Sequence, residues 1–231
     1  MATIQNNVQH VRRQIAEACA AAGRPVDGVA LLCVSKTRPP EAVRAAFDAG
    51  ERRFGENYVQ EGLDKIAALA DLRDRLEWHL IGPLQSNKTR PVAEAFDWVH
   101  SVDRLKIAER LCEQRPAWAA PLQVCLQVNI SGEVSKSGVP AEEVPALAEA
   151  VARLPDTRLR LRGLMSIPEP ADDPAVQREP HRRLRELLQR LNDRGLALDT
   201  LSMGMSADLE AAVLEGATLV RVGTAIFGSR N

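Results

Sequence analysis

A lysine directly follows the first apolar stretch of the chain. Residues 29–35 (Val-Ala-Leu-Leu-Cys-Val-Ser) are typical of a buried strand, and Lys36 comes straight after them. In strand geometry Leu32, Val34 and Lys36 point to one side, so we expect the amine to face the interior. Desolvation lowers the pKa of an amine and makes it a better nucleophile for an aldehyde, which is Schiff-base chemistry. The commoner alternative is a strand-end lysine that extends its amine into solvent.

An arginine lies on one side of the last apolar stretch, residues 218–223. Leu219, Arg221 and Gly223 share that side of the predicted strand. A guanidinium buried there stays charged and needs an acceptor. That acceptor is either a carboxylate such as Glu56, in a structural ion pair, or the ring nitrogen of a bound pyridine. Both interpretations stay open at this point.

Two segments with glycines and hydroxyl groups follow the last two predicted strands. They are Leu201-Ser-Met-Gly-Met-Ser206 and Gly223-Thr-Ala-Ile-Phe-Gly228. Glycine lets the backbone approach an oxyanion closely, and the start of a following helix adds a favourable partial charge. Glycine and serine also form ordinary turns. Their joint position, where barrels commonly hold phosphate, predicts a phosphate site.

A repeating pattern of short apolar runs and longer helical stretches must position these residues. The predicted strands are 29–35, 52–55, 77–81, 98–101, 122–129, 159–165, 200–203 and 218–223. Helical patterns cover 40–49, 59–69, 104–115, 141–154, 175–194 and 207–214. This alternation predicts an α/β fold, a single (β/α)8 TIM barrel formed by residues 1–231 with an extra N-terminal helix. Closure of such a barrel places the last strand beside the first, so we expect Arg221 to lie near Lys36. A doubly wound open sheet is the rival, but no G-x-G-x-x-G follows the first strand.

A barrel places functional residues where its strands end, and every predicted strand here ends on polar residues. One such residue would indicate only a helix cap, whereas eight ends together indicate a lined pocket. The residues at these ends are Lys36, Glu56, Asn57, His79, Ser101, Asp103, Asn129, Ser131, Ser166, residues 202–206 and residues 221–224.

Composition excludes several classes of function. The net charge is −1 and the pI is near 6.5, which disfavours binding to nucleic acid or to an acidic membrane surface. The four cysteines form no C-x-x-C pair, so we expect a reduced, cytoplasmic protein. No export signal or membrane-spanning segment is apparent. The four histidines lack metal-ligand spacing, so we expect no metal.

From the first strand to the C-terminal end, the residues resemble the pyridoxal phosphate homeostasis proteins, whose fold is similar to the barrel domain of alanine racemase. The motifs occur in the expected order along the chain. They are Val34-Ser-Lys-Thr37, Phe54-Gly-Glu-Asn-Tyr-Val-Gln-Glu61, Trp78-His-Leu-Ile-Gly-Pro-Leu-Gln-Ser-Asn-Lys88, His100-Ser-Val-Asp103, Gly163-Leu-Met165, Leu201-Ser-Met-Gly-Met-Ser206 and Val220-Arg-Val-Gly-Thr-Ala-Ile-Phe-Gly228.

The resemblance implies that Lys36 holds pyridoxal 5′-phosphate (PLP) as an internal aldimine and that Arg221 faces the pyridine nitrogen. It also implies a phosphate site and a pocket lining. The phosphate residues are Ser202, Ser206, Gly223 and Thr224, and the remaining pocket residues are Asn57, His79, Met165, Ser166 and Met203. Leu80 stands where the family pattern has phenylalanine, a difference that affects packing rather than chemistry.

The same residues argue against catalysis. PLP enzymes draw electrons into a protonated pyridine ring, and an arginine at the ring nitrogen disfavours that protonation. Alanine racemase tolerates such an arginine but adds a second domain with a catalytic tyrosine. Here the chain ends three residues after Gly228, and Tyr58 is its only tyrosine. We therefore expect no obvious second base.

The resulting expectation is a monomer that carries or buffers PLP for PLP-dependent apoenzymes without turning over a substrate. One alternative is a weak one-base PLP-dependent amino-acid racemase. Another is a barrel enzyme that acts on phosphorylated sugars without a cofactor. Racemisation of single enantiomers and an absorption band of the PLP imine discriminate these hypotheses.

Overall fold

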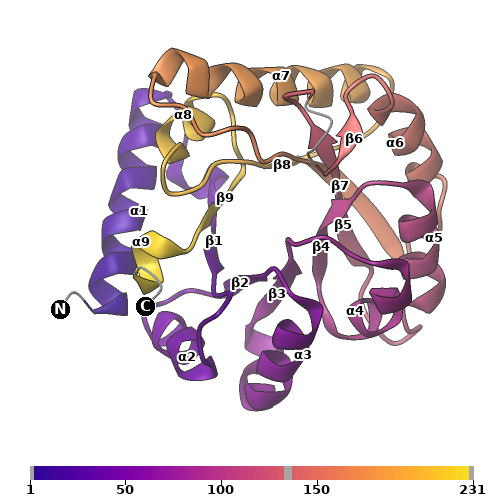
Figure 1. Cartoon of the computed structure of the whole chain (residues 1–231), viewed down its shortest axis with the longest axis horizontal. Helices are drawn as coiled ribbons and strands as arrows, with labels where there is room; N and C mark the ends of the chain where they lie inside the picture. The colour runs from indigo at the N-terminus through magenta and orange to yellow at the C-terminus, as the bar shows by residue number, and fades with distance from the viewer. Residues whose placement is uncertain (1–2, 133–136, 229–231) are drawn as a thin grey trace.

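A closed barrel of parallel strands forms the centre of the computed structural model, which describes residues 3–132 and 137–228. Figure 1 shows the strands as a ring with the helices outside it. The order around the ring is β4-β3-β2-β1-β9-β8-β7-β5, and pairing of β4 with β5 closes it. These strands are β1 (Ala30–Val34), β2 (Arg53–Glu56), β3 (Glu77–Leu80), β4 (Trp98–Val102), β5 (Leu122–Asn129), β7 (Leu159–Met165), β8 (Thr200–Ser202) and β9 (Leu219–Val222). The predicted TIM barrel is confirmed.

Barrel closure brings the first and last strands of the ring together. β1 pairs with β9 in parallel, and Leu32 lies opposite Arg221 in that register. The predicted proximity of the Lys36 and Arg221 segments therefore follows from the topology. A further short strand, β6 (Val139–Pro140), pairs with the end of β5 and was not predicted.

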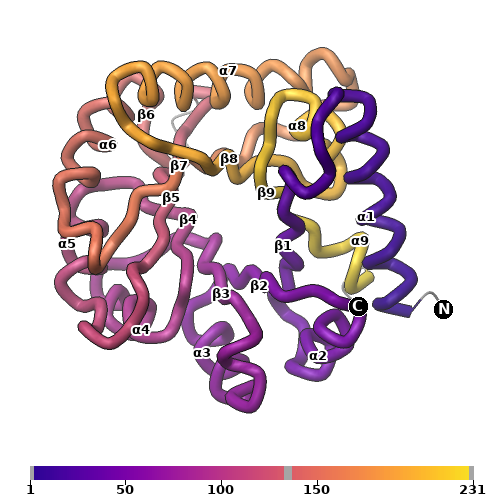
Figure 2. Tube along the Cα trace, turned by 180° about the vertical axis from the view of Figure 1, so that it is seen from behind, coloured from indigo at the N-terminus to yellow at the C-terminus, as the bar shows by residue number. Residues whose placement is uncertain are grey.

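The helices cover the outside of the barrel, which Figure 2 shows from behind. All the predicted helices form: α1 (Ile4–Ala21), α2 (Pro40–Asp48), α3 (Val59–Ala68), α5 (Leu105–Gln114), α6 (Val144–Ala152), α7 (Pro174–Asp193) and α8 (Leu209–Leu214). The short helices α4 (Thr89–Ala95) and α9 (Thr224–Phe227) are additional. Short 3-10 helices occupy Val26–Gly28, Ala70–Arg75 and Ser86–Lys88.

The predicted extra N-terminal helix, α1, is also confirmed. It packs beside helices from the beginning and from the end of the barrel. Its N-cap, Thr3, accepts a hydrogen bond from the backbone of Asn6 at 3.2 Å. Val8, Val11 and Ile15 are buried at helical spacing on one face. Through this face α1 packs against α2, α8 and α9.

The strands bury side chains on both of their faces. The outward face joins the helices in one large core, whereas Leu32, Val34, Ile81 and Leu219 pack together inside the barrel. The interior also holds polar side chains, including the fully buried His79 and His100. Because buried polar groups need partners, their arrangement inside the barrel defines the candidate site.

Candidate functional site

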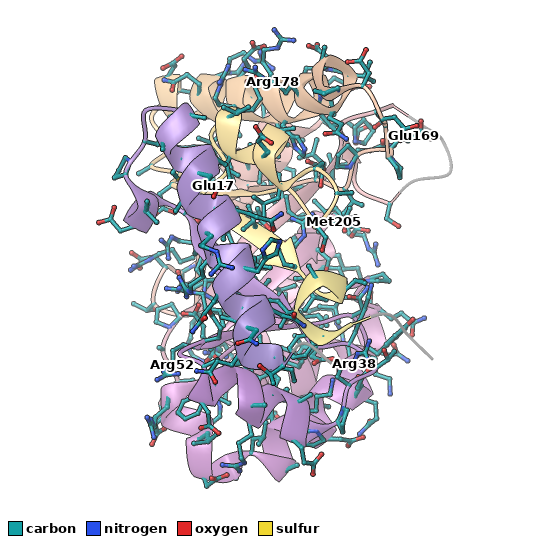
Figure 3. The ribbon with its side chains drawn as sticks, turned by 90° about the vertical axis from the view of Figure 1, so that its left-hand side faces the viewer. Glu17, Arg38, Arg52, Glu169, Arg178 and Met205 are labelled. Carbon is teal, nitrogen blue, oxygen red and sulfur yellow. The ribbon has the colours of Figure 1, made fainter. Side chains whose placement is uncertain are left out.

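A cavity of about 320 Å³ lies at the carboxyl ends of the strands. In Figure 3, the labelled Arg38 and Met205, both of which line this cavity, lie on one side of the molecule, and Arg52 lies on the other. Six of the predicted site residues line the cavity: Lys36, Asn57, Ser206, Arg221, Gly223 and Thr224. Sequence reasoning missed several others in the lining, among them Thr37, Arg38, Ile81, Ile167, Met205 and Phe227.

The other predicted site residues do not line this cavity. His79, Ser166 and Ser202 are fully buried, and Met165 packs inside the barrel against Trp98 and Cys125. Met203 instead belongs to the core between the barrel and its helices. A cofactor contact for these residues therefore remains a prediction.

A tight turn after β1 presents Lys36, which is half-buried, to the cavity. Thr37 has a φ of 63°, and it is the single non-glycine residue with positive φ in the described ranges. This conformation is strained for a β-branched residue and persists where the surroundings hold it. The Thr37 backbone N–H donates to Glu61 at 2.5 Å, and the N–H of Arg38 donates to the Ser35 carbonyl at 3.0 Å.

Behind this turn lies a buried network that centres on Lys65. The Lys65 ammonium donates to the Ser35 carbonyl at 2.6 Å, to Glu56 at 2.8 Å and to Glu61 at 2.7 Å. The Ser35 hydroxyl also donates to Glu56 at 2.6 Å. Burial raises the pKa of Glu56, although the bonds from Lys65 and Ser35 oppose that shift. The network ties the Lys36 turn to α3.

Glu56 is therefore the partner of Lys65 and not of Arg221. The interpretation of Arg221 as half of an ion pair with Glu56 is wrong. Sequence reasoning missed Lys65, although its spacing of four residues from Glu61 on a helix is a signal for such a pair.

Arg221 is buried in the barrel wall and binds neutral oxygens. Its Nη1 donates to the Ser202 carbonyl at 2.6 Å and to the Ser202 hydroxyl at 2.8 Å, and its Nη2 donates to the Ser166 carbonyl at 2.8 Å. Within residues 3–132 and 137–228, no carboxylate forms an ion pair with it. Burial lowers the pKa of Arg221 to about 10, so the group stays charged at neutral pH. Because a guanidinium has five N–H groups, Arg221 keeps donors for an acceptor in the cavity.

The cavity ends at two loops in which backbone segments approach closely. A Cβ added to Gly223 would lie 3.1 Å from the Val34 carbonyl oxygen. Gly204 has a φ of 88°, and a Cβ there would lie only 2.5 Å from the Cβ of Ala212. These glycines let the loops after β8 and β9 bring the hydroxyls of Ser206 and Thr224 to the same cavity.

A larger cavity of about 850 Å³ opens at the opposite, N-terminal end of the barrel. Much of its charge is already paired, because Arg53 bonds Glu77 at 3.1 Å and Arg73 bonds Asp97 at 2.8 Å. Barrel active sites lie at the carboxyl ends of the strands, so the smaller cavity is the candidate site.

The described ranges contain neither a metal-binding cluster nor a membrane-spanning helix. No group of three or more His, Cys, Asp or Glu residues there could hold a metal ion. None of the helices in these ranges is long and apolar enough to cross a membrane.

A family model and two sequence relatives indicate the family to which this chain belongs. The family model "Alanine racemase, N-terminal domain" matches residues 2–231. A protein of Pseudomonas aeruginosa is 64% identical over 231 residues, which cover 100% of this chain and 97% of the relative. A protein of Escherichia coli K12 is 53% identical over 232 residues, with 100% and 98% coverage. Both relatives are named pyridoxal phosphate homeostasis protein.

Solved structures agree with these relatives. PipY of Synechococcus elongatus with PLP bound has a TM-score of 0.80 and 39% identity, and the match covers 93% of this chain and 100% of PipY. Alanine racemase of Corynebacterium glutamicum shares the fold, with a TM-score of 0.69 at 18% identity over 98% of this chain and 61% of the racemase. The chain therefore belongs to the alanine racemase N-terminal domain family and, within it, to the pyridoxal phosphate homeostasis proteins.

Proposed function

We propose that this chain binds PLP in the cavity at the carboxyl ends of the strands and serves PLP homeostasis by holding and releasing the cofactor. The Lys36 amine forms a covalent Schiff-base link to the PLP aldehyde, with loss of water. One observation carries this proposal: Arg221, a buried guanidinium without a carboxylate partner in the described ranges, lines the same cavity as Lys36.

The residues present fit the chemical groups of PLP. The amine of Lys36 suits the aldehyde, the spare donors of Arg221 suit the pyridine nitrogen, and the loop hydroxyls of Ser206 and Thr224 suit the phosphate. The Oδ1 atom of Asn57 is buried and has no hydrogen-bond partner among the described residues, which leaves an acceptor for a donor in the cavity. The cavity volume is also within the range of small-molecule sites.

The same geometry favours a carrier over an enzyme. Bound PLP supplies an electron-withdrawing pyridine ring, and its strength as an electron sink depends on protonation of the ring nitrogen. Arg221 can only donate at this position, because its pKa of about 10 keeps it charged. Tyr58 does not line the cavity and is 61% exposed, so it is not placed to act as a second base.

The proposal extends to the whole protein. The cavity and the network behind Lys36 are built from one barrel, so we propose a single domain over residues 1–231. We further propose a monomer that acts in the cytoplasm and passes PLP to PLP-dependent apoenzymes.

Absorbance and optical rotation test this function together. Addition of PLP to the purified protein is expected to produce a band at about 420 nm, typical of a PLP imine, which borohydride removes. Single amino-acid enantiomers incubated with the loaded protein are expected to keep their optical activity. Absence of the band would contradict the Schiff-base link to Lys36, whereas steady racemisation would support the one-base racemase instead.

A further inference from the structure

Five side chains form a continuous hydrogen-bonded chain through the interior of the barrel. Glu77 Oε1 lies 2.8 Å from His79 Nε2, and His79 Nδ1 lies 2.9 Å from His100 Nε2. His100 Nδ1 lies 2.8 Å from the hydroxyl of Ser202, which accepts a bond from Arg221 Nη1 at 2.8 Å. The step from His100 on β4 to Ser202 on β8 joins strands that are not neighbours, so the chain crosses the barrel interior.

The two ends of this hydrogen-bonded chain limit how its protons can be arranged. A guanidinium only donates, and a carboxylate only accepts. Burial opposes ionisation of Glu77, yet its contacts with His79 and Arg53 lower its pKa to about 2, so it is a carboxylate at neutral pH. His79 must therefore donate from Nε2 to Glu77. If both imidazoles are neutral, His79 Nδ1 accepts from His100 Nε2, and His100 Nδ1 accepts from the Ser202 hydroxyl.

Both rings are fully buried, which disfavours the imidazolium form, so both imidazoles are neutral Nε2–H tautomers. Burial lowers the pKa of His79 and, more strongly, that of His100. The His79 ring also stacks on the ring of Trp98, with centroids 5.4 Å apart, which excludes water from that face. A proton added to His79 would reverse the bonds as far as Ser202 and leave the Ser202 hydroxyl with two donors pointing at its oxygen.

When both imidazoles are neutral, the Ser202 hydroxyl forms hydrogen bonds with its proton and with its oxygen. Its proton is donated to His100 Nδ1, and its oxygen accepts from Arg221. Ser202 is also fully buried and does not line the cavity, whereas Ser206 is exposed and does. A hydroxyl held in this way has no proton to offer an anion.

We propose that Glu77, His79, His100 and Ser202 are positioning residues for Arg221, and that the Ser202 hydroxyl orients this guanidinium instead of binding the cofactor phosphate. The inference rests on the proposed function, because it takes PLP as the ligand of the cavity. It assigns to Ser202 a role at the pyridine end of PLP and leaves the phosphate to the Ser206 and Thr224 loops.

Binding of PLP and of pyridoxal, which lacks the phosphate, separates the two roles. In Ser202→Ala, Arg221 loses one anchor, so the affinities for PLP and for pyridoxal are both expected to fall, each by about tenfold. The ratio of the two dissociation constants should stay that of the wild type. In the matched control Ser206→Ala, PLP should weaken while pyridoxal binds as before.

A larger loss for PLP than for pyridoxal in Ser202→Ala would show that Ser202 binds phosphate, and would overturn the inference. Unchanged affinities for both ligands would overturn it as well. If PLP fails to bind the wild type at all, it is the proposed function that fails.

A measurement on the unliganded wild type tests the hydrogen-bonded chain without substituting any of its five side chains. Two-bond 1H–15N correlation spectra near neutral pH report histidine tautomers. His79 and His100 are both expected as neutral Nε2–H forms, with the signals of His10 and His181 identified by substitution. An Nδ1–H tautomer or an imidazolium at either position would contradict the directed chain, whatever the result with PLP.

Discussion

At the scale of single residues, Arg221 is the group on which the choice between carrier and enzyme depends. It is held by three bonds to the oxygens of Ser202 and Ser166 and faces no ion-pair partner in the described ranges. The sequence predicted its burial and its place beside Lys36, because strand alternation and barrel closure determine both. The sequence could not identify the acceptor of Arg221. Glu56 accepts instead from Lys65 on α3, and the sequence pattern does not specify how that helix is rotated about its axis.

Arg221→Glu is expected to make the bound ring a better electron sink. A carboxylate near the ring nitrogen raises the pKa of that nitrogen through an opposite-charge interaction. The loaded variant should then exchange amino-acid α-protons for solvent deuterium faster than the wild type, as followed by proton NMR. The fold must first be verified by circular dichroism, because an uncompensated buried charge could cost several kcal/mol. Rapid exchange by the wild type and slower exchange by the variant would refute the carrier proposal.

Lys65→Met should destabilise the protein strongly, by about 3 to 5 kcal/mol, because it leaves Glu56 buried without its cation. Urea denaturation measures this change. The matched variant Lys65→Met with Glu56→Gln removes both charges and should recover much of the loss. Equal destabilisation of the single and double variants would show that the ion pair is not the cause.

The ionisation of Glu77 is expected to make the free energy of unfolding depend on pH. Its folded-state pKa of about 2 lies below the ordinary value of 4.5, so its contribution is complete above that value and is lost as pH falls toward 2. Glu77 is 37% exposed, so we expect only roughly 1 to 2 kcal/mol after allowance for screening. The difference in unfolding free energy between wild type and Glu77→Gln should shrink on acidification. A difference that is constant with pH would rule out this contribution.

At the scale of elements, the predicted strands match the observed ones to within one or two residues. Buried parallel strands are continuous apolar runs, and turns or polar residues end them sharply. The elements not predicted are short: α4, α9 and β6. Such pieces carry too few residues to show a period, and tertiary contacts hold them. For example, α9 begins after Gly223, where the backbone approaches Val34 closely.

The loop between β8 and α8 depends on glycine at position 204. In Gly204→Ala both the positive φ and the clash with Ala212 oppose folding. We expect a loss larger by about 1 to 3 kcal/mol than that of Gly23→Ala, whose φ is also positive but which has open space around it. Denaturant titration of both variants measures the difference. Equal losses would mean that α8 moves to accommodate the methyl group.

At the scale of the whole molecule, barrel closure assembles the site from distant parts of the chain. Lys36 follows the first strand, and Arg221 lies on the last strand, which pairs with it. The sequence therefore predicted the cavity and six residues of its lining. It could not predict that His79, His100 and Ser202 form one chain, because that contact crosses the interior between strands that do not pair. Side-chain packing, and not periodicity, determines such a contact.

PLP is expected to raise the stability of the whole barrel. A ligand that binds only the folded state adds roughly 2.7 kcal/mol when its free concentration is about 100 times the dissociation constant. Pyridoxal at the same concentration should add much less, because it lacks the phosphate that the loops of Ser206 and Thr224 would bind. Thermal unfolding with each ligand compares the two, and equal shifts would remove the phosphate site from the account.

Peptide mapping after borohydride reduction of the PLP-loaded protein tests the central claim most directly. The pyridoxyl group is expected on the peptide that contains Lys36, and Lys36→Ala, folded by circular dichroism, is expected to carry none. Lys88→Ala, at an exposed lysine, is the matched control and should be labelled like the wild type. A pyridoxyl group on Lys88 or on Lys136, which lies outside the described residues, or a label retained by Lys36→Ala, would contradict the account.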